Sequence, residues 1–264
     1  MEENRAGPDL PGQYFPFRRL SFDQIRDVVR TPSAGYTSAF YGDAELKQRF
    51  VERAKMHRAA DEIVRGTYWS TKYGESGERA GFQGCAVGCL SHASEEAHRV
   101  LSRLTNVPQA IYQLTDYLFE NRNLDGHKDL PLAVMEAIPV GSDQSHTHYR
   151  ILARLLENSY MLAGGEARRN KVIALLRDPA IDPKEKLEAV NKIARVYSWT
   201  TIDTFFWSYF AGLNTASTMR DILLEELAAA PVPTVETAND DQLTMAEFMK
   251  DFVTVEESVE VLAS

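Results

Sequence analysis

The sequence has few cysteines and no long apolar run, and both absences limit what kind of protein it can be. Two cysteines among 264 residues exclude a disulfide-stabilised scaffold. No apolar stretch approaches the roughly 18 residues of a membrane-spanning helix, and the first residues lack the pattern of a signal peptide. We therefore expect a soluble cytoplasmic protein with reduced thiols and no membrane association.

Basic residues are also in short supply. Lys and Arg total 29 against 38 Asp and Glu, which gives a net charge of -9. Binding to duplex nucleic acid normally needs a basic surface, so we do not expect this protein to bind a duplex directly. Residues 231–264 contain eight acids and one base, so this segment carries seven of the nine excess negative charges.

What the sequence does have is helical periodicity, because apolar residues recur at steps of three and four through most of its length. This predicts an all-α, or nearly all-α, fold with one compact multi-helix domain over residues 43–230. An irregular, aromatic N-terminal arm (1–42) precedes the domain, and a flexible acidic tail (231–264) follows it. Helices are expected at 22–29, between Asp43 and Gly66, and at 84–104, 107–120, 130–138, 143–164, 166–177, 183–199 and 204–227. The only segment suspected of strand structure is 67–72.

The tail contains a set of apolar residues at spacings that allow a short amphipathic helix. They are Leu243, Ala246, Phe248, Met249, Phe252 and Val253. Such a helix can dock in the groove of a partner protein, and the simpler interpretation is a solvated terminus.

Two polar residues fall on the apolar face of the helix expected after Asp43. His57 and Asp61 are four residues apart on that face, together with Phe50 and Ala54. Burying an imidazole and a carboxylate without partners is costly, so we expect them to bond to each other or to a shared group. They are either a satisfied core pair or part of a site that binds a metal ion or relays a proton.

A second polar stripe is expected on the next helix, where Cys85, Cys89, His92 and Glu96 follow one another at steps of four, three and four. Two thiols and an imidazole can hold zinc or iron, with His57 or Asp61 completing the ligand set. In a version without metal, one of the thiols is activated as a nucleophile. The alternative is a tight helix crossing in which the cysteines act as small hydrophobic residues.

The segments around these residues resemble a family of bacterial and phage proteins to which no activity is assigned. The shared pattern runs from His57 to Ala60-Asp61-Glu62, through Gly84-Cys85-Ala-Val-Gly-Cys89 with His92, to Leu114–Glu120 and Glu136-Ala-Ile-Pro-Val-Gly141. The resemblance covers roughly residues 45–160. It implies a bacterial or phage protein, in the host cytoplasm if a phage encodes it, and transfers no mechanism. The motif positions that it marks are His57, Asp61, Glu62, Cys85, Cys89, His92 and Asp143.

These observations lead to two hypotheses about function. In the first, a small polar site binds a metal ion or ligand, or positions a thiol for hydrolysis. His57 or His92 is then the base, Asp61 is its orienting group, and Cys89 or a metal ion is the source of the nucleophile. In the second, the chain is a non-enzymatic interaction or inhibitor protein, such as a phage accessory factor. It then binds a protein partner through its N-terminal arm or acidic tail.

Overall fold

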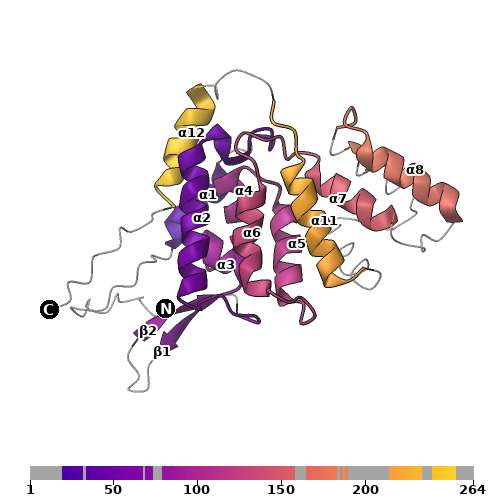
Figure 1. Ribbon diagram of the computed structural model, residues 1–264. Coiled ribbons are helices and arrows are strands. Elements are labelled where there is room, and N and C mark those ends of the chain that lie inside the picture. Colours follow the sequence, from indigo (N-terminus) through magenta and orange to yellow (C-terminus); the bar gives the residue numbers. More distant parts are fainter. Residues whose placement is uncertain are drawn as a thin grey trace.

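The computed structural model describes residues 20–31, 34–67, 69–73, 79–157, 165–182, 185–186, 188–189, 214–233 and 240–253. Helices dominate this part of the chain, which confirms the all-α prediction (Figure 1). The α-helices are α1 (Phe22–Arg30), α2 (Ala44–Ala59), α3 (Ala86–Ser91), α4 (Ala97–Thr105), α5 (Gln109–Glu120), α6 (Leu130–Ala137), α7 (Thr147–Glu157), α8 (Gly165–Arg177), α11 (Ala216–Ala228) and α12 (Asp240–Lys250). Two 3-10 helices, η1 (Ala39–Gly42) and η2 (His127–Asp129), and a hairpin of β1 (Trp69–Tyr73) and β2 (Arg79–Gly84) complete the set. None of the described helices is long and apolar enough to cross a membrane.

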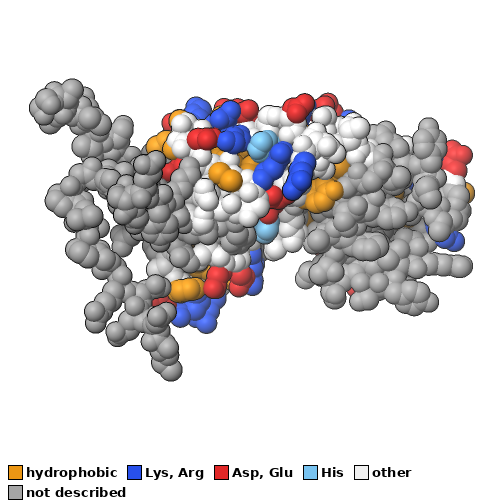
Figure 2. Space-filling view, turned by 90° about the horizontal axis from the view of Figure 1, so that it is seen from below, with side chains coloured by type: hydrophobic (Ala, Val, Ile, Leu, Met, Phe, Trp, Pro, Cys, Tyr) orange, Lys and Arg blue, Asp and Glu red, His pale blue; other side chains and the backbone are white. Residues whose placement is uncertain are grey.

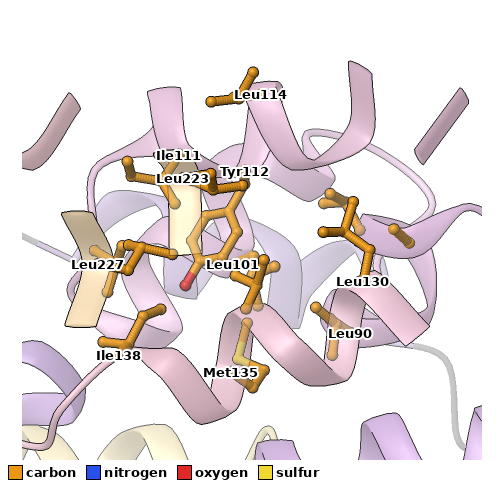
Figure 3. Packing of buried hydrophobic residues seen from close by; sticks show 14 of the residues in the cluster. Leu90, Leu101, Ile111, Tyr112, Leu114, Leu130, Met135, Ile138, Leu223 and Leu227 are labelled. Atoms are coloured by element: carbon orange, nitrogen blue, oxygen red, sulfur yellow. The ribbon is translucent and has the colours of Figure 1, made fainter. Parts of the chain in front are cut away.

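The hydrophobic core lies where α3, α4, α5, α6 and α11 meet (Figure 3). Each of these helices contributes at least one apolar side chain without solvent exposure: Leu90, Leu101, Tyr112, Met135 and Leu223. Burial of this apolar surface is the main favourable contribution to folding. It joins distant parts of the chain into one body, which holds the polar residues described below in fixed positions.

Helix α2 begins as expected and ends earlier than expected. The Asp43 side chain accepts a hydrogen bond of 2.8 Å from the backbone N–H of Leu46, which caps the helix. The helix stops at Ala59, before the predicted end at Gly66, because Asp61 adopts a left-handed backbone conformation with φ of 53°. The chain therefore leaves the helical path before it reaches Glu62.

The single helix predicted over 84–104 is two helices, α3 and α4. Gly84 ends strand β2, which pairs antiparallel with β1, so the segment suspected of strand structure is part of a hairpin. Cys85 is the N-cap of α3, and the left-handed conformations of His92 (φ 54°) and Glu96 (φ 48°) separate α3 from α4. A continuous helical face from Cys85 to Glu96 therefore does not exist.

Most of the other predicted helices are present with shifted ends. Helix α1 carries a capping box between Ser21 and Gln24, and α5, α6 and α8 lie in their expected ranges. Helix α7 covers the middle of the range predicted as 143–164. The helix predicted at 183–199 and the first part of the one at 204–227 fall largely outside the described residues.

The short helix predicted in the acidic segment is α12, and it packs on the body of the protein. Ala246, Met249 and Val253 are buried there. The Lys250 ammonium group lies 2.8 Å from the Asp43 carboxylate and 3.1 Å from that of Glu45. The described part of the segment expected to be flexible thus contacts α2 and η1 (Figure 1).

Candidate functional site

The structure brings together the two predicted histidines where α2 and α3 end. The Nε2 atoms of His57, in the last turn of α2, and His92, the C-cap of α3, are 2.8 Å apart. Their rings are nearly perpendicular, at 88°, and are 0% and 1% exposed. This distance is that of a hydrogen bond, so one ring donates and the other accepts.

Glu62 continues this chain of polar groups on the other side of His57. Its Oε2 atom lies 2.8 Å from His57 Nδ1. Burial lowers the pKa of His57, and the Glu62 carboxylate opposes this only in part, so His57 is neutral at pH 7. A neutral ring has one N–H, and the carboxylate can only accept, so His57 donates from Nδ1 and accepts from His92 at Nε2.

Asp61, which the sequence analysis placed beside His57, lies elsewhere. Its exposed carboxylate forms an ion pair with the Lys128 ammonium group. The prediction that His57 and Asp61 share one helical face is wrong, because the helix ends at Ala59 and the backbone turns at Asp61. Glu62 takes the place that Asp61 was expected to fill.

The two cysteines lie one turn apart, Cys85 as the N-cap of α3 and Cys89 within the helix. Cys89 Sγ lies 3.5 Å from the backbone oxygen of Gly84 and 3.8 Å from that of Glu62, so Cys89 borders the histidine pair through Glu62. Cys85 Sγ accepts from Gly88 N–H at 3.3 Å. The predicted stripe of Cys85, Cys89, His92 and Glu96 is therefore wrong, because the helix that would align it is interrupted.

The structure bears on the predicted thiol nucleophile mainly at Cys85, which is not poised for that role. Burial raises the pKa of Cys85, and the negative charge of Asp116 raises it further, so Cys85 is protonated at neutral pH. Cys89 donates from its sulfur to backbone carbonyl oxygens, and its role as a nucleophile stays a prediction.

The geometry gives no support to the predicted zinc or iron site. No group of three or more His, Cys, Asp or Glu within the described ranges could hold a metal ion. Two nitrogen ligands of one tetrahedral zinc are about 3.3 Å apart, from bonds of about 2.05 Å. The Nε2 atoms of His57 and His92 would have to separate by roughly 0.5 Å to bind zinc together, since they are 2.8 Å apart. Metal binding stays a prediction.

Arg53 supports the histidine pair from one turn earlier in α2. The buried guanidinium group donates to the backbone oxygens of Leu90, at 2.9 Å, and Phe252, at 3.2 Å. It thereby ties α2 to α3 and to the segment that follows α12. Leu20, two residues before α1, also contacts the site, since its N–H donates to His92 O at 2.9 Å.

Sequence reasoning missed Arg53, and it marked Glu62 only as a motif position of the resemblance, without giving it a role in the site. Arg53 was detectable, because Leu46, Phe50, Arg53 and His57 follow one another at steps of four, three and four on the face of α2 that is buried. Glu62 was not detectable by periodicity, since it lies after the end of the helix. Comparison with models of known families, with curated proteins and with solved structures finds no match for this chain.

Proposed function

We propose that the protein is an acid–base catalyst of the hydrolytic type, and that its centre is the chain Glu62–His57–His92. The observation that supports this is the alignment of three titratable groups through two contacts of 2.8 Å in a buried environment. A carboxylate that fixes one imidazole, which in turn contacts a second, is suited to proton transfer.

Proton transfer along this chain needs no net change in its hydrogen-bond connections. A water or substrate hydroxyl group gives its proton to His92 Nδ1, and His92 passes the proton on its Nε2 to His57 Nε2. His57 then carries the positive charge, which the Glu62 carboxylate 2.8 Å from Nδ1 stabilises. In this scheme His92 is the catalytic base, and Glu62 and His57 act through it.

Access to His92 requires a movement of the chain, because His92 is buried. His92 lies in the connection between α3 and α4, and its backbone oxygen is bonded to Leu20 N–H. The connection (92–96) contains two residues in the left-handed conformation and has no regular structure, unlike the helices on either side. A substrate would reach the His92 ring only after this connection changes its conformation, and catalysis would follow that movement.

The test compares the wild type with Glu62→Gln and His92→Asn in hydrolysis of a panel of carboxylic esters, phosphoesters and peptides. Glu62→Gln keeps a hydrogen-bond acceptor for His57 and removes the charge that stabilises it. Asp61→Asn is the matched control, because Asp61 is adjacent in sequence and pairs with Lys128 at the surface. We expect turnover in the wild type and the control and a loss of about 100-fold or more in the other two variants.

Two results would count against this proposal. If the wild type turns over none of the substrate classes faster than His92→Asn does, catalysis is contradicted. Stoichiometric zinc or iron in the purified wild type, lost in His57→Gln, would instead identify the histidines as metal ligands.

A specific observation favours the second candidate function, binding of a protein partner. Leu243 and Phe248 of α12 are exposed although the opposite side of the helix is packed on the body. Phe248 also packs against Phe252, with ring centroids 5.0 Å apart, so two aromatic rings lie together there. Acidic and basic side chains are interspersed on the face in Figure 2, so a charged patch of one sign does not dominate that face. If a defined partner binds the wild type and not Leu243→Lys or Phe248→Lys, the exposed side of α12 is its docking surface.

A further inference from the structure

Two arginines of α2 hold the end of α12, and they lie in line with His57. Arg49 Nη1 donates to the backbone oxygen of Lys250 at 3.1 Å. One turn later, Arg53 Nη2 donates to the backbone oxygen of Phe252 at 3.2 Å. Residues four positions apart lie on one face of a helix, so the row from Arg49 through Arg53 continues to His57. The end of α12 and the histidine pair are therefore joined through the buried side chain of Arg53.

Helix α12 is attached to the body by a small apolar surface. Within the described segment 240–253 the fully buried apolar side chains are Ala246, Met249 and Val253, whereas Leu243 and Phe248 are exposed. Figure 1 shows α12 beside α2 at one side of the molecule, away from the central helices. Elements with few buried apolar contacts open more readily than the core. We therefore expect α12 to be able to separate from the body while the core stays folded.

The buried groups around His57 are balanced in charge only while His57 is neutral. The Glu62 carboxylate and the Arg53 guanidinium group both act on His57, and their opposite charges cancel. A proton taken up by His57 leaves this buried group with one excess positive charge. Buried surroundings make an uncompensated charge unfavourable, so protonation favours a rearrangement that removes it.

The other titratable groups near His57 do not supply that compensation. On α3, His92 contacts the His57 ring, and Cys89 donates to the backbone oxygen of Glu62. Charged side chains elsewhere around α2 interact with one another: Lys250 with Asp43 and Glu45, Asp129 with Arg58, Lys128 with Asp61, and Glu136 with Lys47. The repulsion that follows protonation of His57 therefore acts on Arg53, one turn away on the same helix.

Arg53 is held in its buried position by bonds that face two different parts of the protein. One acceptor, the backbone oxygen of Leu90, belongs to α3, a helix that is buried throughout. The other, the backbone oxygen of Phe252, belongs to the segment after α12. The Nε atom of Arg53 has no hydrogen-bond partner among the described residues. A guanidinium group driven outward therefore leaves on the side of α12, and its bond to Phe252 breaks.

We propose that α12 is an acid-released strap: when His57 takes up a proton, the Arg53 guanidinium group leaves its buried position, its bond to Phe252 is lost, and α12 separates from the body. Because linked equilibria are reciprocal, anything that lifts α12 from the body also makes His57 easier to protonate. The inference does not depend on catalysis at the histidine pair, since it needs only the protonation of His57 and the bonds that Arg53 makes.

The experiment is hydrogen exchange of the full-length protein at about pH 7.5 and 5.5, expressed as protection relative to an unstructured chain at the same pH. Peptides that cover α12 report on the strap, and peptides that cover α5 report on the core. Arg53→Met and His57→Gln each remove one group of the switch. Arg49→Met is the matched control, because Arg49 makes the same kind of bond to the end of α12 and lies two turns from His57.

In the wild type we expect the protection of α12 to fall about fivefold to tenfold from the higher to the lower pH, because the open state binds a proton with the ordinary His pKa of about 6.5. The protection of α5 should fall by a different factor, since α12 opens on its own. Arg49→Met should lower the protection of α12 at both pH values and keep its pH dependence. Arg53→Met and His57→Gln should lose that pH dependence.

Circular dichroism checks the fold of each variant, and the comparison of Arg53→Met with Arg49→Met decides the result if His57→Gln does not fold. Equal protection of α12 at both pH values in the wild type would overturn the proposal. Equal pH dependence in Arg53→Met and Arg49→Met would overturn it as well. If α12 and α5 lost protection by the same factor in the wild type, the loss would report unfolding of the whole domain, and α12 would not be a strap.

Discussion

His57 and His92 are 35 positions apart in the sequence, and their Nε2 atoms are 2.8 Å apart in the structure. Three features produce this contact. Helix α2 presents His57 on its buried face, the left-handed backbone at His92 ends α3, and Glu62 fixes the orientation of the His57 ring. The contact therefore depends on residues of two helices and on the residue that follows α2.

Replacing Glu62 by Leu is expected to lower the free energy of unfolding by about 1–3 kcal/mol, because the buried Nδ1–H of His57 loses its acceptor. Glu62→Gln should cost less, since the amide oxygen can still accept. Asp61→Asn should change stability by about 0.5 kcal/mol or less, because its ion pair with Lys128 is exposed and Asn tolerates the left-handed conformation. Urea unfolding followed by circular dichroism measures all three. Equal losses for Glu62→Leu and Asp61→Asn would show that the Glu62 contact contributes nothing.

The neighbouring positions Asp61 and Glu62 also show how far the sequence determines this site. Helical periodicity placed His57 on the buried face correctly, because that rule depends only on positions inside one helix. It failed four residues later, since the helix ends at Ala59 and the left-handed residue redirects the chain. That change of direction depends on tertiary contacts, such as the pairing of Val64 N–H with Gly84 O, which no local pattern reveals.

Tertiary contacts that no local pattern reveals also explain why the single helix predicted over 84–104 is wrong. Apolar spacing from Gly84 to Leu104 fits one helix, yet the chain uses Gly84 in β2 and ends α3 after Ser91. The overall all-α prediction was robust because it rests on many segments, whereas the alignment of Cys85 with His92 rested on one uninterrupted segment. The contact between His98 and Asp116 joins two helices, and a single sequence carries no signal for such pairings.

Acidification should destabilise the protein through His57. Burial lowers the pKa of His57 in the folded state, so the unfolded chain takes up this proton first as the pH falls through about 6.5. The free energy of unfolding therefore decreases below that pH, by up to about 1.4 kcal/mol per pH unit for this group. In His57→Gln the decrease between about pH 7.5 and 5.5 should be smaller, since carboxylates of ordinary pKa titrate at lower pH. Denaturant unfolding at several pH values measures both slopes, and parallel curves for wild type and variant would contradict the assignment.

Lys250 is expected to hold α12 on the body. Its ammonium group contacts Asp43 and Glu247 at 2.8 Å and is largely buried. Lys250→Met leaves the partly buried Asp43 carboxylate without its cation, so we expect a loss of about 1–3 kcal/mol and faster hydrogen exchange in α12. Lys128→Met removes the exposed pair with Asp61 and should cost about 0–1 kcal/mol, with no effect on α12. Unchanged exchange in α12 after Lys250→Met would show that apolar packing alone holds this helix.

Arg53 allows the opposite kind of test, because here a buried charge opposes stability. Its guanidinium group has no carboxylate partner within the described residues, its Nε atom has no hydrogen-bond partner, and burial lowers its pKa. Arg53→Met keeps most of the side-chain volume and removes the cost of burying the cation, at the expense of the bonds to Leu90 and Phe252. We expect a net change within about 1 kcal/mol for Arg53→Met and a loss of about 2–5 kcal/mol for Arg53→Ala, which leaves a cavity. Calorimetric unfolding of both variants measures the difference. A loss in Arg53→Met as large as that in Arg53→Ala would mean that the two bonds to backbone oxygens outweigh the desolvation of the charge.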